Sequence, residues 1–251
     1  KTFIILFSSV SLFFVSHAAF AQSPLTGDQP ISKPILILFV LFILSLAPFI
    51  LMMTTSFVKI AVVLSLVRSA IGVQQIPPNQ IITGLALILT VYVMIPVGQK
   101  VYDASADVIH ARGQQEILSI ASVDVFKEAV NKGKEPVREF LLKHANDKER
   151  KLFYNMGKKL KINDTLGGLE NNDFIVLIPA FVISELAEAF QIGFIIFLPF
   201  LVIDMVVSNI LLSMGMFQVS PITVALPFKL LLFVLVDGWY LIAEGLVRGY
   251  M

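Results

Sequence analysis

Four long apolar segments follow one another along this chain, separated by turns and by one polar stretch. They cover residues 35–70, 80–98, 174–212 and 222–247. Turns at residues 72–79 and 213–221 separate the members of each pair, and both turns contain proline and glycine. A membrane helix needs about 20 apolar residues, so each segment is long enough to cross a bilayer. The pattern therefore predicts two helical hairpins in a membrane.

The polar stretch between the hairpins, residues 100–173, holds most of the charged side chains of the chain. Its apolar residues recur at helical spacing, which predicts a small water-exposed helical insert that ends in a loop at residues 163–172. Disorder is the alternative, because apolar residues are sparse here. The predicted fold class is an all-α membrane protein. It has two helical hairpins with broken helices, at residues 35–99 and 174–251, and a small polar helical insert.

The N-terminal residues have the arrangement of a secretory signal peptide. Lys1 precedes an apolar run over residues 3–15, and Ala19-Phe20-Ala21 provides a small-x-small cleavage site. We therefore predict a signal peptide over residues 1–21, cleaved after Ala21, and a linker over residues 22–34. A retained first membrane helix is the alternative, although the run is short for a span.

Cleavage predicts which side of the membrane the polar insert faces. The new N-terminus would lie outside the cytoplasm, and two crossings would put the insert on the periplasmic side. Its many Lys and Arg residues favour the cytoplasm instead, but this charge rule is weak for loops longer than about 60 residues. We follow the signal peptide and expect a periplasmic insert.

Composition excludes several function classes. The chain is 57% hydrophobic and 15% charged, whereas soluble domains are about a quarter charged. The net charge of +1 says nothing about nucleic acid, and no basic, aromatic-interleaved patch argues for nucleic-acid binding, so we expect no nucleic-acid partner. The chain contains no Cys, which rules out disulfides and thiolate chemistry.

Catalytic motifs are weak in this chain. Gly157-Lys158-Lys159 lacks the upstream glycine and the Ser/Thr of a Walker loop, and no H-E-x-x-H is present. Ser56 and Lys59 match S-x-x-K, which arises often by chance, and no partner motif follows. We therefore expect a protein that is not an enzyme and that has no cofactor and no metal site.

Charged side chains inside the apolar segments are the candidate functional residues. They are Lys59, Arg68, Glu185, Glu188, Asp204, Lys229 and Asp237. Such charges usually face a protein interior or a watery cavity. Glu185 and Glu188 share one helix face. They could form an acid/base pair or a proton relay. As structural groups they would pair with Lys59, Arg68 or Lys229 on a neighbouring segment, and we favour such pairing, or hydration, in an assembly.

Met214, Met216 and Phe217 lie at the turn of the second hairpin. Core packing is the usual role of methionine. At this position, however, flexible side chains from several copies could form a soft apolar constriction that excludes water. The residues alone leave both interpretations open.

Eight motifs spread over both hairpins, from about residue 34 to residue 251, resemble the FliP/SctR family. They are Ser56-Phe57-Val58-Lys59-Ile60, Pro77-Pro78-Asn79-Gln80, Gly84-Leu85-Ala86-Leu87, Ser184-Glu185-Leu186, Ala189-Phe190-Gln191-Ile192-Gly193-Phe194, Pro199-Phe200-Leu201-Val202-Ile203-Asp204, Ala225-Leu226-Pro227-Phe228-Lys229-Leu230 and Leu232-Phe233-Val234-Leu235-Val236-Asp237-Gly238-Trp239. The insert resembles the family only loosely.

The resemblance implies a structural subunit of the type III secretion export gate, in the bacterial inner membrane within a secretion basal body. It implies about five copies, joined by FliQ/SctS-like and FliR/SctT-like membrane subunits and a FlhB/SctU-like switch subunit, with unfolded exported proteins passing through. It also implies that Met214, Met216 and Phe217 form a gasket around the channel.

Two features of the resemblance bear on the type of system. A cleavable signal peptide is similar to the flagellar form, whereas residues 72–78 and 218–221 are more similar to the virulence form, so an injectisome is slightly favoured. A secondary transporter, or another proton-coupled membrane protein that uses intramembrane carboxylates, is the alternative function. Four segments without an evident repeat are few for that fold.

Overall fold

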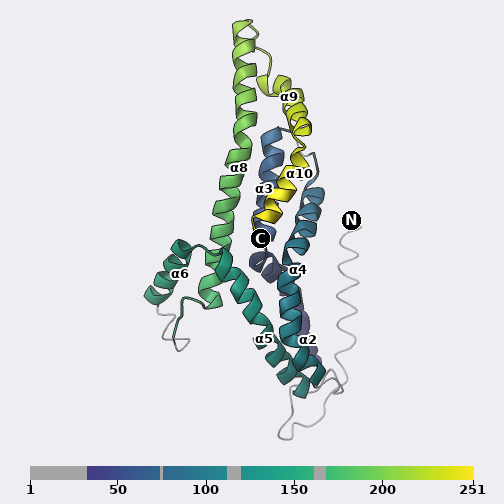
Figure 1. Cartoon of the computed structure of the whole chain (residues 1–251), viewed down its shortest axis with the longest axis vertical. Helices are drawn as coiled ribbons and strands as arrows, with labels where there is room; N and C mark the ends of the chain where they lie inside the picture. The colour runs from purple at the N-terminus through teal and green to yellow at the C-terminus, as the bar shows by residue number, and fades with distance from the viewer. Residues whose placement is uncertain (1–32, 74–75, 112–119, 161–167) are drawn as a thin grey trace, which may run out of the picture. The chain divides into compact units, whose positions relative to one another are not determined.

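The computed structural model describes residues 33–73, 76–111, 120–160 and 168–251, and within these ranges every regular element is a helix (Figure 1). The helices are α2 (Lys33–Thr54), α3 (Phe57–Ile71), α4 (Asn79–Ala111), α5 (Ile120–His144), α6 (Asp147–Lys159), α8 (Phe174–Ser213), α9 (Pro221–Leu235) and α10 (Gly238–Arg248). The predicted all-α fold class is confirmed.

The chain divides into two compact units, Lys1–Leu44 and Ser45–Met251. In the first unit only the beginning of α2 is described, so the predicted signal peptide and its cleavage site after Ala21 lie outside the described residues. Residues 22–32 of the predicted linker, which was expected over residues 22–34, also lie outside the described residues. Its last two residues, Lys33 and Pro34, already belong to α2.

The core of the second unit forms where α3 packs along α8, which run side by side in Figure 1. The buried residues of α3 recur at helical spacing, and they include Ile60, Val63, Leu64 and Val67. The facing residues of α8 include the small residues Ala180, Ala189 and Gly193. A Cβ atom at Gly193 would lie 2.3 Å from Leu66 Cδ1. The missing side chain therefore allows α3 and α8 to approach closely.

Both predicted turns are present. Gly72 ends α3 with a φ of 84°, a left-handed conformation that glycine adopts without strain. Arg68 closes this first turn by donating hydrogen bonds to the Pro77 carbonyl oxygen (3.3 Å) and to the Asn79 side chain. The second turn lies between Ser213, which ends α8, and Pro221, which begins α9.

Helices are broken, as predicted, but away from the prolines. The sequence predicts one helix through residue 70, whereas the chain bends by 68° between Leu44–Thr54 and Phe57–Ile71. A second bend of 59° separates α9 from α10, where Asp237 adopts a φ of 52°. Pro179 and Pro199 lie inside α8, which continues for 40 residues.

The polar insert is helical, as predicted, and it packs on the core. Phe140 and Leu141 of α5 are buried in the main hydrophobic cluster. The backbone amide of Asn146, just before α6, donates a 2.8 Å hydrogen bond to Ser184 Oγ of α8. α4 continues to Ala111, past the expected end of the first hairpin at residue 99.

Two of the described helices are long and apolar enough to cross a membrane, α4 over Asn79–Ala106 and α8 over Phe174–Ser213. Each of the two bent helix pairs meets the same test if the pair is taken as one span, which gives up to four spans. The fold is therefore that of an all-α membrane protein whose longest described helix, α8, carries three of the four candidate carboxylates, Glu185, Glu188 and Asp204.

Candidate functional site

Lys59, in the first turn of α3, lies at the centre of a buried cluster of charges. Its Nζ atom is 3.1 Å from Glu185 Oε1 and 2.6 Å from Glu188 Oε2. The Glu185 side chain is fully buried, whereas that of Glu188 is 46% exposed. Residues three apart lie on one helix face, so a single ammonium group reaches both carboxylates.

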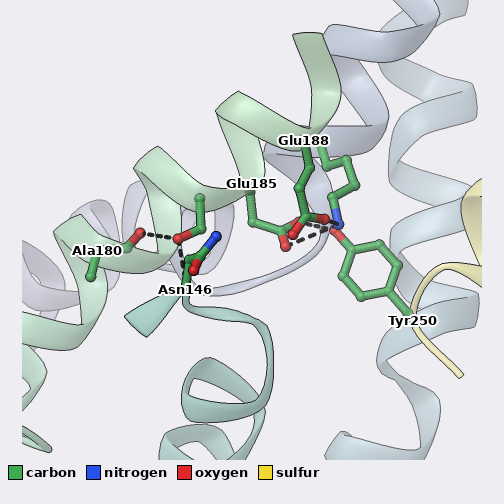
Figure 2. Close-up of polar contacts among 7 residues, drawn as sticks. Asn146, Ala180, Glu185, Glu188 and Tyr250 are labelled. Carbon is green, nitrogen blue, oxygen red and sulfur yellow. Dashed lines mark hydrogen bonds and ion pairs between the residues drawn. The ribbon is translucent and has the colours of Figure 1, made fainter. Parts of the chain in front are cut away.

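Tyr250, two residues beyond the end of α10, completes this cluster. Its hydroxyl group donates a hydrogen bond to Glu185 Oε2, and Figure 2 shows its ring pointing toward the two glutamates. Lys59 Nζ lies 4.4 Å from the centroid of the same ring, within the range of a cation–π contact. Burial, followed by the charge of Glu185, raises the pKa of Tyr250 above its usual value. The phenol therefore stays protonated and remains a donor.

Two aromatic residues of α5 pack against Tyr250 from the insert side. The ring centroids of Tyr250 and Phe140 are 6.1 Å apart, with an interplanar angle of 18°. The ring centroids of Tyr250 and His144 are 4.9 Å apart. The pKa of His144 is lowered to about 4. Burial is the largest cause, and the positive charges of Lys143 and Lys59 are the next largest. His144 is therefore neutral at pH 7 and adds no positive charge beside Lys59.

The cluster is built to hold charges in place. An isolated buried carboxylate is very unfavourable, and it is tolerated when a counter-charge and hydrogen bonds compensate it. Glu185 has both, the Lys59 ammonium from α3 and the Tyr250 hydroxyl from the C-terminal segment. The three elements that supply these groups are thereby fixed to one another.

A second ion pair joins α8 to α9. Lys229 Nζ lies 2.6 Å from Asp204 Oδ2, with the lysine side chain 5% exposed. The same ammonium donates a 3.4 Å hydrogen bond to the Ala70 carbonyl oxygen, in the last turn of α3. Cations near a helix C-terminus interact favourably with its unpaired carbonyl groups. Lys229 therefore ties α9 both to α8 and to the end of α3.

The remaining predicted charges stand apart from these two clusters. Arg68 bonds to the turn at residues 77–79 and makes no ion pair among the described residues. Asp237 is exposed at the bend between α9 and α10, where its backbone carbonyl accepts from the Leu241 amide. Of the three candidate basic partners for Glu185 and Glu188, the structure brings only Lys59 to them.

Sequence reasoning missed Tyr250 and His144. A spacing of four residues between Phe140 and His144 indicates a shared helix face, but no sequence signal assigns them a partner from the end of the chain. Tyr250 follows α10 and is separated from it by Gly249. Only its contacts identify it as part of the cluster.

The predicted gasket residues lie at the tip between α8 and α9. Met214, Met216 and Phe217 are 67%, 41% and 78% exposed. Gly215, with a φ of 72°, turns the chain between the two methionines. The single chain therefore leaves three large apolar side chains uncovered at the end of its second hairpin.

Comparison with known proteins gives a consistent match. The model of the FliP family matches residues 40–246. Yop proteins translocation protein R of Yersinia pestis is 50% identical over 214 residues, which cover 85% of this chain and 95% of that protein.

Flagellar and virulence proteins of other bacteria are also similar. The flagellar biosynthetic protein FliP of Bacillus subtilis (strain 168) is 43% identical over 225 residues, 90% of this chain and 96% of that protein. Virulence protein YscR of Salmonella typhimurium is 40% identical over 219 residues, 87% of this chain and 97% of that protein.

Proposed function

This chain belongs to the FliP family, and from that membership we propose that it forms part of the wall of a protein export channel. The family consists of structural components of type III secretion export, so the chain is an export-gate subunit and not an enzyme. With two to four candidate spans, it is a multi-pass protein of the inner membrane. The proposal also includes the channel itself, its gasket and its partner subunits.

The observation that carries the proposal is the pairing of the membrane charges inside one chain. Lys59 compensates Glu185 and Glu188, and Lys229 compensates Asp204. A proton carrier needs a free carboxylate that water or substrate can reach. The Glu185 side chain is fully buried, and Glu188, which is 46% exposed, is held 2.6 Å from the Lys59 ammonium. These contacts favour a structural subunit over the proton-coupled alternative.

The exposed apolar tip supports the proposed gasket. Three large apolar side chains, Met214, Met216 and Phe217, have little cover within the described part of the chain. A ring of about five copies would bring these tips together around one axis. Methionine is flexible enough to close around a moving polypeptide, and an apolar ring of this kind excludes water when it is empty.

Replacing Met214 and Met216 together with Ala tests the gasket. We expect increased leakage of small solutes across the inner membrane, or impaired secretion of substrates, with normal amounts of assembled complex. Met205→Ala is the matched control, because Met205 is 56% exposed on α8 but lies away from the tip. Normal leakage and normal secretion in the double variant would contradict the gasket.

The proposed partners follow the family. They are FliQ/SctS-like and FliR/SctT-like membrane subunits, a FlhB/SctU-like switch subunit and unfolded exported proteins, with the polar insert on the periplasmic side. The described residues contain broad apolar surfaces, with exposed side chains along α8 and α9 such as Phe194, Val202 and Val234. Large exposed apolar side chains of this kind are consistent with burial against lipid and neighbouring subunits.

An injectisome remains the favoured system. The Yersinia relative named for Yop translocation is 50% identical, against 43% for the flagellar protein of Bacillus subtilis. Expression of this chain in two strains tests the preference, one lacking its injectisome R protein and one lacking its flagellar FliP. We expect secretion to be restored in the first strain and motility to stay absent in the second. The reverse result would assign the chain to a flagellum.

A further inference from the structure

Charged side chains of the second hairpin are paired within the chain, with one exception. Residues 174–251 carry seven charges. Six of them form ion pairs with one another or with Lys59, namely Glu185, Glu188, Asp204, Lys229, Glu244 and Arg248. The seventh, Asp237, is exposed, makes no ion pair with another described residue and does not cap α10 with its carboxylate. One negative charge of this hairpin is therefore left uncompensated.

Asp237 lies within an exposed apolar surface. The large side chains that flank it in the sequence are Val234 (73% exposed), Leu235 (73%), Val236 (47%), Trp239 (40%) and Tyr240 (59%). Exposed apolar surface that contains Trp and Tyr is typical of a protein interface. Covering this surface would also bury the carboxylate, and an unpaired buried charge is very unfavourable. Whatever covers the surface must therefore bring a positive charge.

The bend between α9 and α10 holds Asp237 in its outward position. Gly238 is buried on the inner side of the bend, where a Cβ atom would lie 2.3 Å from the Phe233 ring. The Trp239 ring packs edge-on against the same phenylalanine, with 5.3 Å between centroids. Asp237 itself has a φ of 52°, the only positive φ of a non-glycine residue in the described ranges. Such a conformation is unfavourable for most side chains and is often found at functional sites.

The positive charge does not come from a second copy of this chain. Lys59, Lys229 and Arg248 already form ion pairs within their own chain. Arg68 donates hydrogen bonds to the turn at residues 77–79. Each of these cations in the described apolar helices is therefore already engaged, and complementarity of charge indicates a different protein.

We propose that Asp237 is the recognition point for an apolar helix of a different export subunit, which pairs a lysine or arginine with this carboxylate. The exposed apolar side chains around Asp237 pack against the rest of that helix. A single charge pair inside an apolar contact fixes the register of the two partners, because a shifted partner would leave both charges unpaired. The inference rests on the proposed function, since it takes the chain to be one subunit of an assembly.

Asp237→Asn tests the proposal in the assembled complex. Asparagine keeps the size of the side chain and tolerates a positive φ, so only the charge is lost. The tagged full chain is co-expressed with the other export subunits, and the subunits that co-purify in detergent are quantified. Loss of one partner of a buried charge pair should weaken the association by about thirtyfold or more. Glu244→Gln is the matched control, because this carboxylate is paired with Arg248 inside the chain, and it should leave co-purification unchanged.

Asp237→Gly separates recognition from a role in the bend itself. Relief of the positive φ opposes the entropic cost of glycine, so the isolated chain should melt at about the same temperature. Assembly should nevertheless fall as it does in Asp237→Asn. A purely structural role of Asp237 would instead change the melting temperature and the assembly together, and that result would overturn the proposal.

A photo-crosslinker identifies the partner helix. p-Benzoylphenylalanine in place of Tyr240, in the first turn of α10, is irradiated in the assembled complex, and the crosslinked peptide is sequenced by mass spectrometry. The same group in place of Tyr92, which is 60% exposed on α4, is the control and should give a different peptide. We expect the Tyr240 position to capture an apolar segment of another subunit that contains a lysine or arginine. Asp237→Lys should block assembly, and reversal of that partner charge to Glu should restore it.

Four results would overturn the inference. They are normal co-purification of Asp237→Asn, a crosslink to a second copy of this chain, a crosslinked segment without a cation, and failure of the reversed partner to restore assembly of Asp237→Lys. The proposed function is tested separately in the same preparation. Failure of the unaltered chain to co-purify with any export subunit would contradict that function, whereas normal assembly of Asp237→Asn would leave it intact.

Discussion

Removing the ammonium group of Lys59 is the sharpest test of the buried charge cluster. In Lys59→Met, the fully buried Glu185 carboxylate loses its counter-charge and keeps only the Tyr250 hydroxyl. Deleting one partner of a buried ion pair costs about 3–5 kcal/mol. Glu188 contributes little to this cost, because its side chain is 46% exposed and can be hydrated.

The expected result is a large drop in thermal stability in detergent. For a domain of 150–250 residues, 1 kcal/mol shifts the melting temperature by about 2–4 °C. A loss of about 3 kcal/mol then corresponds to about 6–12 °C. The single tryptophan of the chain, Trp239, packs edge-on against Phe233 and provides a fluorescence signal for unfolding.

Two controls separate loss of the buried pair from other effects. Lys59→Met combined with Glu185→Gln removes both charges and keeps an amide oxygen that can accept from the Tyr250 hydroxyl. It should recover most of the lost stability, because no charge is then left buried without a partner. Arg248→Gln removes an ion pair with Glu244 in which the arginine side chain is 73% exposed. Exposed pairs are worth at most about 1 kcal/mol. A stable Lys59→Met protein, or a double variant no better than the single one, would refute the reasoning.

Two further predictions concern a glycine and a histidine. Gly238→Ala should destabilise the protein by about 1–3 kcal/mol through overpacking, because its Cβ atom would lie 2.3 Å from the Phe233 ring. Gly245→Ala, with no atom within 4 Å, should be neutral or stabilising in the same melting experiment. The lowered pKa of His144, about 4 against 6.5, means that the unfolded chain binds the proton first. Stability should therefore decrease as pH falls from about 6.5 to 4, and His144→Gln should flatten this dependence in melts across that range.

Hydrophobic patterning predicted the elements of this protein because patterning is a local property. Both turns end and begin helices within a residue or two of the expected positions, at Gly72 and Asn79 and at Ser213 and Pro221. The family resemblance rested on motifs within these elements, and the match over residues 40–246 confirms it. Side-chain chemistry also indicated that charges in apolar helices need partners.

The sequence predicted that helices would be broken, but it did not predict where the breaks lie. Proline is the usual cause of a break, yet Pro179 and Pro199 lie within the continuous α8. The bends lie instead at residues 55–56 and at Asp237. Sequence alone does not reveal such bends, because they depend on how the flanking helices pack against the rest of the chain.

The sequence by itself determined the class of the protein, the order of its helices and the need for compensating charges. Only the tertiary structure decided that Lys59 forms ion pairs with both Glu185 and Glu188. It also decided that Lys229 pairs with Asp204 and that Tyr250 donates a hydrogen bond to Glu185. Helix periodicity follows from neighbouring residues, whereas an ion pair joins helices far apart in the chain. Its identity depends on which helix faces meet, and packing of the whole fold determines those faces.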